Sequence, residues 1–183
     1  LEFRRVLFRS SEIASPCRGA LPSISPPMAH ELKLKEGDAA PAFTALANGG
    51  QTVALADFRR RPVILYFYPK DDTPGCTKEA CAFRDAFADF TARGAVVLGV
   101  SADPVKSHDK FVQKFKLPFL LLADEDKRIV DAYGVWGEKT FMGRRYQGIL
   151  RVTFLIGGDG RIRKIWPKVK PDEHAAEVLA ALG

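Results

Sequence analysis

The 183-residue chain is long enough for a single domain with a buried core, and 46% of its residues are apolar, as in ordinary globular proteins. Its 28 Lys and Arg against 22 Asp and Glu give a formal charge of +6. This excess is spread along the chain, which argues against a concentrated nucleic-acid-binding face. No apolar run approaches the roughly 20 residues that span a bilayer. We therefore expect neither nucleic acid nor membrane as a partner.

The three cysteines, Cys17, Cys76 and Cys81, are too few for a disulfide scaffold in a chain of this length. An odd number fits a reducing compartment in which at least one thiol is kept for reactivity. The first residues also lack the continuous apolar segment of a secretory signal, because Arg, Ser and Pro interrupt them. These features predict a cytoplasmic protein.

Residues 1–27 show neither helical nor strand periodicity, and residues 21–27 are rich in Pro and Ser. Residues 2–10 resemble the conceptual translation of a sequencing adapter, which makes Met28 the natural start. The Arg and Ser content also permits an organelle transit peptide. We predict a non-native or disordered tail over residues 1–27, in which Cys17 has no role, and one domain over residues 28–183.

The first predicted elements lead to a buried strand. An Asn-Gly-Gly turn signal at 48–50 lies between short apolar segments and predicts an N-terminal hairpin. The basic triplet at 59–61 is expected to be a solvated loop. Residues 63–68 are continuously apolar between two prolines, as in a central strand covered on both faces. Apolar residues then recur at helical spacing from Pro74 towards Gly94.

The alternation of strands and helices continues to the C-terminus. We expect strands at 95–101 and 118–122, helices beginning at Asp103 and covering 124–133, and a loop over residues 134–148. Residues 149–156, a Gly-rich turn at 157–160 and residues 161–166 predict an antiparallel hairpin, and a last helix covers residues 171–182. This order predicts an α/β, thioredoxin-like fold with a mixed central sheet and helices on both faces.

Cys76 is the first candidate for chemistry because it lies where a predicted strand ends and a helix begins. Thr73 is a favourable N-cap and Pro74 a favourable first helical residue, which places Cys76 in the first turn. Backbone N–H groups and the helix dipole stabilise a negative sulfur there, and the thiolate is the reactive form of cysteine. We expect Cys76 to be substantially ionised. The alternative is a small apolar residue packed under the helix start.

Cys81 lies five positions after Cys76. In a regular helix, Cα atoms at this spacing are about 9 Å apart, and disulfides seldom bridge more than about 7 Å. If the two cysteines form a disulfide, the first turns of the helix must unwind. The alternative is a buried helix cysteine without a redox role.

Other kinds of site have weaker support. His30, His108 and His174 show no ligand spacing to the cysteines, so no metal site is expected. We expect His108 on the surface of a helix and His174 in the first turn of the last helix. A Cys–His nucleophile pair stays open on sequence distance but has no local signature. The glycines at 157–160 lead into a strand, which is typical of a hairpin turn and not of a phosphate-binding loop.

The segment around Cys76 resembles the peroxiredoxins, whose active-site pattern Pro-x-x-x-Thr-x-x-Cys is matched by Pro69, Thr73 and Cys76. The variant Cys-Thr-Lys-Glu-Ala-Cys at 76–81 is similar to the bacterioferritin comigratory protein or peroxiredoxin Q branch. So are Tyr-Gly-Val-Trp-Gly-Glu at 133–138 and Arg-Val-Thr-Phe-Leu-Ile at 151–156. The resemblance covers nearly the whole chain from about residue 36.

This resemblance implies a thiol peroxidase that reduces hydrogen peroxide and organic hydroperoxides. It makes Cys76 the peroxidatic cysteine, which becomes a sulfenic acid, and Cys81 the resolving cysteine, which closes an intramolecular disulfide. Thr73 would hydrogen-bond the thiolate and the peroxide, and Pro69 would shield the sulfur from water. Arg151 would hold the peroxide and favour the thiolate. Judged by its alternating neighbours alone, Arg151 is equally well a solvent-facing strand residue.

The resemblance also implies recycling by thioredoxin or a similar dithiol, without a metal, flavin or haem. We expect a monomer. Two other classes stay open on the residues themselves. A thiol–disulfide oxidoreductase generally has two residues between its cysteines, whereas this chain has four. A nucleic-acid or chaperone-like binding module has little support, because the basic residues do not cluster.

Overall fold

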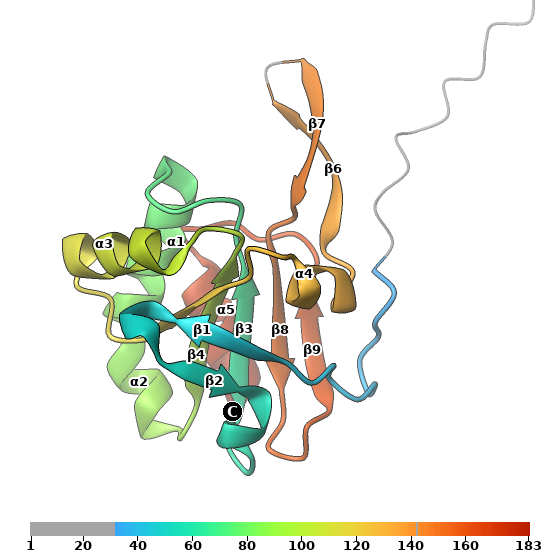
Figure 1. Ribbon diagram of the computed structural model, residues 1–183. Helices are drawn as coiled ribbons and strands as arrows, with labels where there is room; N and C mark the ends of the chain where they lie inside the picture. The colour runs from blue at the N-terminus through green and yellow to red at the C-terminus, as the bar shows by residue number, and fades with distance from the viewer. Residues whose placement is uncertain (1–31, 142) are drawn as a thin grey trace, which may run out of the picture.

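A seven-stranded mixed sheet organises the protein (Figure 1). The computed structural model describes residues 32–141 and 143–183, so the predicted tail, Cys17 and His30 lie outside the described residues. The order of the strands is β2-β1-β5-β4-β3-β8-β9. Their bounds are β1 Thr44–Ala47, β2 Thr52–Ala54, β3 Val63–Phe67, β4 Val96–Ser101, β5 Leu120–Ala123, β8 Val152–Ile156 and β9 Ile162–Trp166. β3, β4 and β5 are parallel, and the other neighbours are antiparallel.

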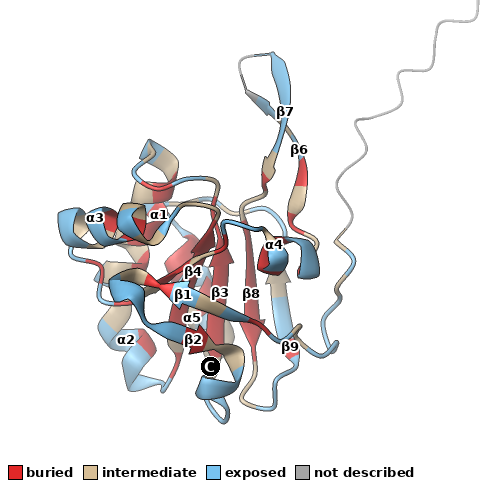
Figure 2. Ribbon diagram, viewed as in Figure 1, coloured by how far each residue is buried: buried red, intermediate tan, exposed pale blue. Residues whose placement is uncertain are grey.

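Strand β3 lies near the centre of the sheet because all of its residues are apolar and buried. Side chains of a strand alternate between the two faces of a sheet. The odd-numbered residues of β3 therefore pack in one core and the even-numbered residues in the other. The central strands are correspondingly buried in Figure 2. Burial on both faces is what the continuous apolar sequence predicted.

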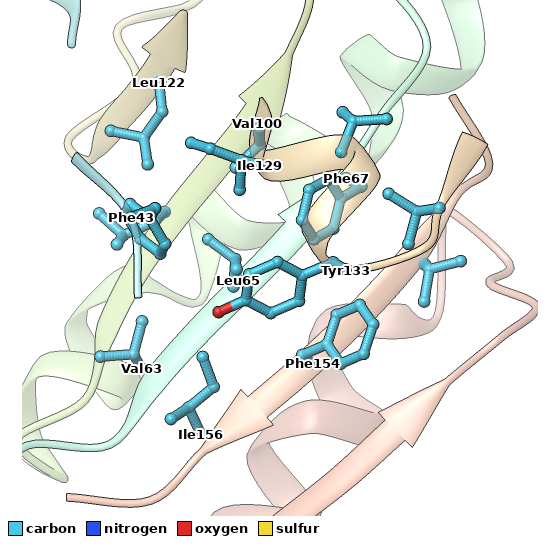
Figure 3. Packing of buried hydrophobic residues seen from close by; sticks show 14 of the residues in the cluster. Phe43, Val63, Leu65, Phe67, Val100, Leu122, Ile129, Tyr133, Phe154 and Ile156 are labelled. Carbon is cyan, nitrogen blue, oxygen red and sulfur yellow. The ribbon is translucent and has the colours of Figure 1, made fainter. Parts of the chain in front are cut away.

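Helices cover both faces of the sheet, which confirms the predicted fold class. The α-helices are α1 Pro74–Asp85, α2 Phe87–Ala92, α3 Val105–Phe115, α4 Arg128–Ala132 and α5 His174–Leu182, with 3-10 turns η1 Asn48–Gly50 and η2 Leu55–Phe58. On the face of α4, the ring of Tyr133 lies 5.4 Å from Phe67 and 5.1 Å from Phe154 between centroids (Figure 3). On the opposite face, residues of α1, α2, α3 and α5 pack against the even-numbered side chains of β3.

The predicted loop over residues 134–148 is wrong. Strands β6 (Trp136–Phe141) and β7 (Arg144–Ile149) form an antiparallel hairpin that projects from the body of the protein (Figure 1). Most of β7 is exposed, so its side chains need not alternate between apolar and polar. The period that identifies half-buried strands is therefore absent from this segment.

Other boundaries differ from the predictions by a few residues. The predicted helix after Pro74 is divided at Ala86, whose φ of −91° and ψ of 6° leave the helical region between α1 and α2. β8 begins at Val152, and α5 begins at His174. The predicted hairpins β1–β2 and β8–β9 are both present, and β1 also pairs with β5. No helix of residues 32–141 and 143–183 has the length and apolar character needed to cross a membrane.

Gly99 in β4 provides a test of how tightly the core under α1 is packed. A Cβ atom at position 99 would lie 2.7 Å from Leu121 Cδ2 and 2.8 Å from Tyr66 Cζ. The ring of Tyr66 is itself stacked on Phe83 at 4.9 Å, so it has little room to move. We expect Gly99→Ala to lower the free energy of unfolding by about 1–3 kcal/mol through overpacking, measured by urea denaturation.

The matched control is Gly148→Ala in β7, where the added Cβ would meet nothing closer than Lys139 Cδ at 3.4 Å. Its stability should change by less than about 1 kcal/mol. Equal effects of the two substitutions would contradict the packing argument.

Candidate active site

Helix α1 begins where the sequence predicted. Thr73 has the extended φ and ψ of an N-cap, Pro74 is the first helical residue, and Cys76 lies in the first turn. The first helical hydrogen bond runs from Thr77 N to Thr73 O at 2.8 Å. The hydroxyl of Thr73 does not cap the helix; it donates to Lys70 O at 3.1 Å and so stabilises the preceding loop. N–H groups of the first turn have no acceptor within the helix.

A cation lies directly against the Cys76 thiol. The sulfur is buried, with 2% of the residue exposed, and Arg151 Nη2 donates to Sγ at 3.2 Å. A Cβ atom at position 75 would lie 3.3 Å from the same Nη2, so Gly75 gives the guanidinium room beside the helix start. The guanidinium thus offers the sulfur a charge-assisted hydrogen bond.

Arg151 lies between β7 and β8, and only 19% of its side chain is exposed. Its interpretation as a solvent-facing strand residue is therefore wrong. Although burial lowers the pKa of Arg151, the charges of Glu79 and Cys76 raise it, with a net increase. The guanidinium is thus permanently cationic beside the sulfur.

Glu79 is a buried residue of the site that the sequence analysis did not identify. Its Oε2 accepts from Arg151 Nη1, and no hydrogen-bond partner for its Oε1 is found in the described part of the chain. Burial raises the pKa of Glu79 to about 7, although the charge and hydrogen bond of Arg151 oppose the increase. The available signal was its spacing, because a residue three positions after Cys76 lies on the same face of the helix.

Cys81 lies in the same continuous helix as Cys76 and is half-buried. Both cysteines are free thiols. The regular-helix separation expected for their Cα atoms therefore applies to this state of α1. A disulfide between them requires the helix to unwind.

The projecting hairpin brings a second cation towards the thiol. Lys139 of β6 donates from Nζ to Ile149 O at 2.8 Å. Burial and the charge of Arg151 lower the pKa of Lys139, whereas the charge of Cys76 opposes this decrease. Lys139 was not among the predicted site residues, because the hairpin that positions it was not predicted.

The described histidines do not form a metal centre. His108 is completely buried, so its prediction as a surface residue is wrong: Nδ1 lies 2.8 Å from Asp71 Oδ2. His174 lies in the first turn of α5 and is also buried, with Nε2 2.8 Å from Thr153 Oγ1. Within residues 32–141 and 143–183, no three His, Cys, Asp or Glu side chains are arranged to hold a metal ion.

Comparison with known proteins gives matches over most of the chain. Residues 36–165 match the AhpC/TSA family. The putative peroxiredoxin bcp of Coxiella burnetii is 50% identical over 151 residues, which cover 82% of this chain and all of the relative.

Solved structures agree with these sequence matches. A mutant of peroxiredoxin Q from Xylella fastidiosa is 39% identical, with a TM-score of 0.77 over 81% of this chain and 95% of that one. The bacterioferritin comigratory protein of Xanthomonas campestris, studied for alkyl peroxide reduction, is 39% identical, with a TM-score of 0.75 over 83% and 97% of the two chains. The chain therefore belongs to the AhpC/TSA family and, within it, to the Bcp and Q peroxiredoxins, which are peroxidase oxidoreductases.

Proposed function

We propose that this chain reduces hydrogen peroxide and organic hydroperoxides through Cys76 and Cys81, and that thioredoxin or a similar dithiol recycles it. The observation that carries the proposal is the 3.2 Å contact of Arg151 Nη2 with Cys76 Sγ at the start of α1. The relative from Xanthomonas campestris, with its alkyl peroxide reduction, supports organic hydroperoxides as substrates.

The first chemical step is attack of the Cys76 thiolate on one peroxide oxygen. A sulfur–oxygen bond forms with the sulfur electron pair, and the oxygen–oxygen bond breaks. The leaving hydroxide or alkoxide takes a proton and departs as water or an alcohol. Arg151 stabilises the negative charge that moves from the sulfur to the leaving oxygen, which is the kind of charge that preorganised donors stabilise best.

Thr73 and Pro69 complete the proposed peroxide site. The hydroxyl proton of Thr73 is donated to Lys70 O, so its oxygen lone pairs are left to accept from the peroxide O–H. Pro69 is half-buried in the loop before α1, where its ring would limit the access of water to the sulfur. Glu79 fixes the orientation of Arg151 through their buried ion pair.

In the second step, the Cys81 sulfur attacks the sulfenic sulfur of Cys76. A disulfide forms, and the sulfenic oxygen leaves as water after protonation. A dithiol then reduces the disulfide by two thiol exchanges. Because both cysteines belong to one helix, the cycle needs no second chain, which is why we propose a monomer. We also propose the reducing cytoplasm as its location and a domain over residues 28–183 preceded by a tail.

The order of the two steps can be tested by replacing one cysteine at a time. We expect Cys76→Ser to abolish peroxide consumption coupled to thioredoxin oxidation. Cys81→Ser should still give a sulfenic acid at Cys76, detected by trapping and mass spectrometry, but no intramolecular disulfide. Full turnover by Cys76→Ser would contradict the mechanism. Unchanged thioredoxin-dependent cycling by Cys81→Ser would remove Cys81 from its role.

Arg151 is expected to contribute mainly to the first step. Removing one charge-stabilising donor from an active site commonly lowers the rate about 10²–10³-fold, so Arg151→Ala should slow the reaction of Cys76 with hydrogen peroxide by this order. The rate is measured by rapid mixing. Arg145→Ala is the matched control, because Arg145 belongs to β7 and its side chain is 75% exposed. A rate unaffected by Arg151→Ala would make Arg151 a structural residue.

Glu79 should make stability depend on pH in a particular direction. Its pKa is about 7 in the folded protein and 4.5 for an ordinary glutamic acid. The proton on Glu79 therefore stabilises the folded protein. Its contribution to the free energy of unfolding is fully present below pH 4.5 and is lost as the pH rises to about 7, because the unfolded chain releases this proton at a lower pH than the folded protein does. Urea denaturation across this window should therefore show a decline that Glu79→Gln lacks. Glu125→Gln is the control, because Glu125 is exposed. If Glu79→Gln shows the same decline in stability as the unsubstituted protein, the decline belongs to another group.

A further inference from the structure

A buried polar cluster holds the loop between β3 and α1. Asp71 lies in this loop with 7% of its surface exposed. Tyr68 donates from its hydroxyl to Oδ1 at 2.7 Å. Ser107 donates from Oγ to Oδ2 at 2.7 Å, and His108 Nδ1 lies 2.8 Å from the same oxygen. Ser107 and His108 belong to α3, so the carboxylate joins the active-site loop to a neighbouring helix.

The backbone of the same residue has a second attachment. Asp71 N donates to Asp103 Oδ2 at 2.9 Å, and that oxygen also accepts from Ser101 Oγ at 2.8 Å. Ser101 is the last residue of β4. The main chain of Asp71 is therefore fixed to the connection between β4 and α3, and its side chain is fixed to α3 itself.

The carboxylate of Asp71 is both charged and buried, so it needs its hydrogen-bond donors. Burial raises the pKa of Asp71, but the hydrogen bonds and charge of its partners, chiefly His108, lower the pKa by more. The net pKa is below the ordinary value, so the carboxylate is ionised at neutral pH. An ionised carboxylate only accepts, so His108 Nδ1 carries the shared proton. His108 and Tyr68 are almost completely buried, so solvent has little access to replace their hydrogen bonds. Loss of one donor leaves a buried charge undersolvated.

The next residue provides a contrast on the solvent side. Asp72 forms a salt bridge of 2.6 Å with Lys114 of α3, but the two side chains are 47% and 58% exposed. Exposed ion pairs contribute little to stability. Asp72 also has a φ of 54°, in the left-handed region, which aspartate adopts more readily than most residues other than glycine. The buried contacts of Asp71 thus hold the loop more firmly than this exposed ion pair does.

We propose that Asp71, Tyr68, Ser107 and His108 form a clamp that sets the balance between the two cysteine steps. This inference rests on the proposed function, in which α1 must be folded for peroxide attack and unwound for attack by Cys81. Asp71 lies five residues before Cys76, so the clamp restricts the segment that must move when the first turn unwinds. These are positioning residues, because they act on Cys76 through the backbone of the loop.

The clamp predicts opposite changes in the two steps. We expect Asp71→Asn to slow sulfenic acid formation and to accelerate disulfide closure. Disulfide closure should become about tenfold faster, as expected when an opening equilibrium loses a buried hydrogen bond to a charged group. Sulfenic acid formation should slow by a smaller factor, in proportion to the fraction of molecules in which α1 stays folded. Overoxidation of Cys76 to a sulfinic acid in excess hydrogen peroxide should fall accordingly, because the sulfenic acid exists for a shorter time. Rapid mixing followed by trapping and mass spectrometry measures all three species.

Ser107→Ala deletes one donor to Asp71 and serves as the test variant if Asp71→Asn does not fold. We expect Ser107→Ala to change the two rates in the same directions, by smaller factors. The matched control is Lys114→Ala, which removes the exposed contact between the same loop and the same helix and should change neither step more than about twofold. Parallel changes of both steps, or an equal effect of Lys114→Ala, would overturn the clamp. Absence of a Cys76–Cys81 disulfide in the unmodified protein would instead overturn the proposed function.

Discussion

The contacts of the Arg151 guanidinium are the interaction on which the rest of the site depends. One nitrogen donates to the sulfur of Cys76 and another to the carboxylate of Glu79, so two acidic groups share one cation. Glu79 is fully buried, and its raised pKa shows that the cation does not fully offset the loss of water. When Glu79 is protonated, the positive charge of Arg151 is left mainly to the sulfur of Cys76. Burial of the carboxylate thus increases the effect of Arg151 on the sulfur.

Helix α1 is held differently at its two ends. Its second half is fixed by apolar packing, since Phe83 is completely buried and stacks on Tyr66. Its start depends on polar contacts: Arg151 beside Cys76, and the hydrogen bonds of Asp71 in the preceding loop. The contact of Arg151, whose side chain is 19% exposed, can be exchanged for water when the first turn opens, whereas exposing Phe83 would lose a large apolar contact. The start of α1 can therefore unwind at a lower free-energy cost than its end, which is the direction that a Cys76–Cys81 disulfide requires.

The sequence predicted those parts of the fold and site that depend on local patterns. The apolar run of β3 and the Thr-Pro start of α1 were identified because burial, and the preference of proline for the first helical position, leave a signature within a few residues. The hairpin β6–β7 was missed because an exposed ribbon has no apolar alternation. His108 was assigned to the surface of a helix, and its burial could not be predicted locally because its partner Asp71 lies 37 positions away in the sequence. The placement of Arg151 is likewise tertiary: family resemblance indicated its role, whereas its own neighbours did not.

The position of the site follows from the topology of the sheet. β3 and β4 are parallel neighbours, so the loop that carries Asp71 and the connection that carries Asp103 both leave the sheet at the carboxyl ends of these strands. In α/β proteins, active sites commonly form outside the carboxyl ends of the strands. β8 is antiparallel to β3 and begins there, with Val152 opposite Phe67. Arg151 directly precedes Val152 and therefore lies at the level where β3 ends and the active-site loop begins. Since a one-residue slip would turn side chains to the opposite face, the buried register of β3 and β8 determines which side of the sheet receives the arginine.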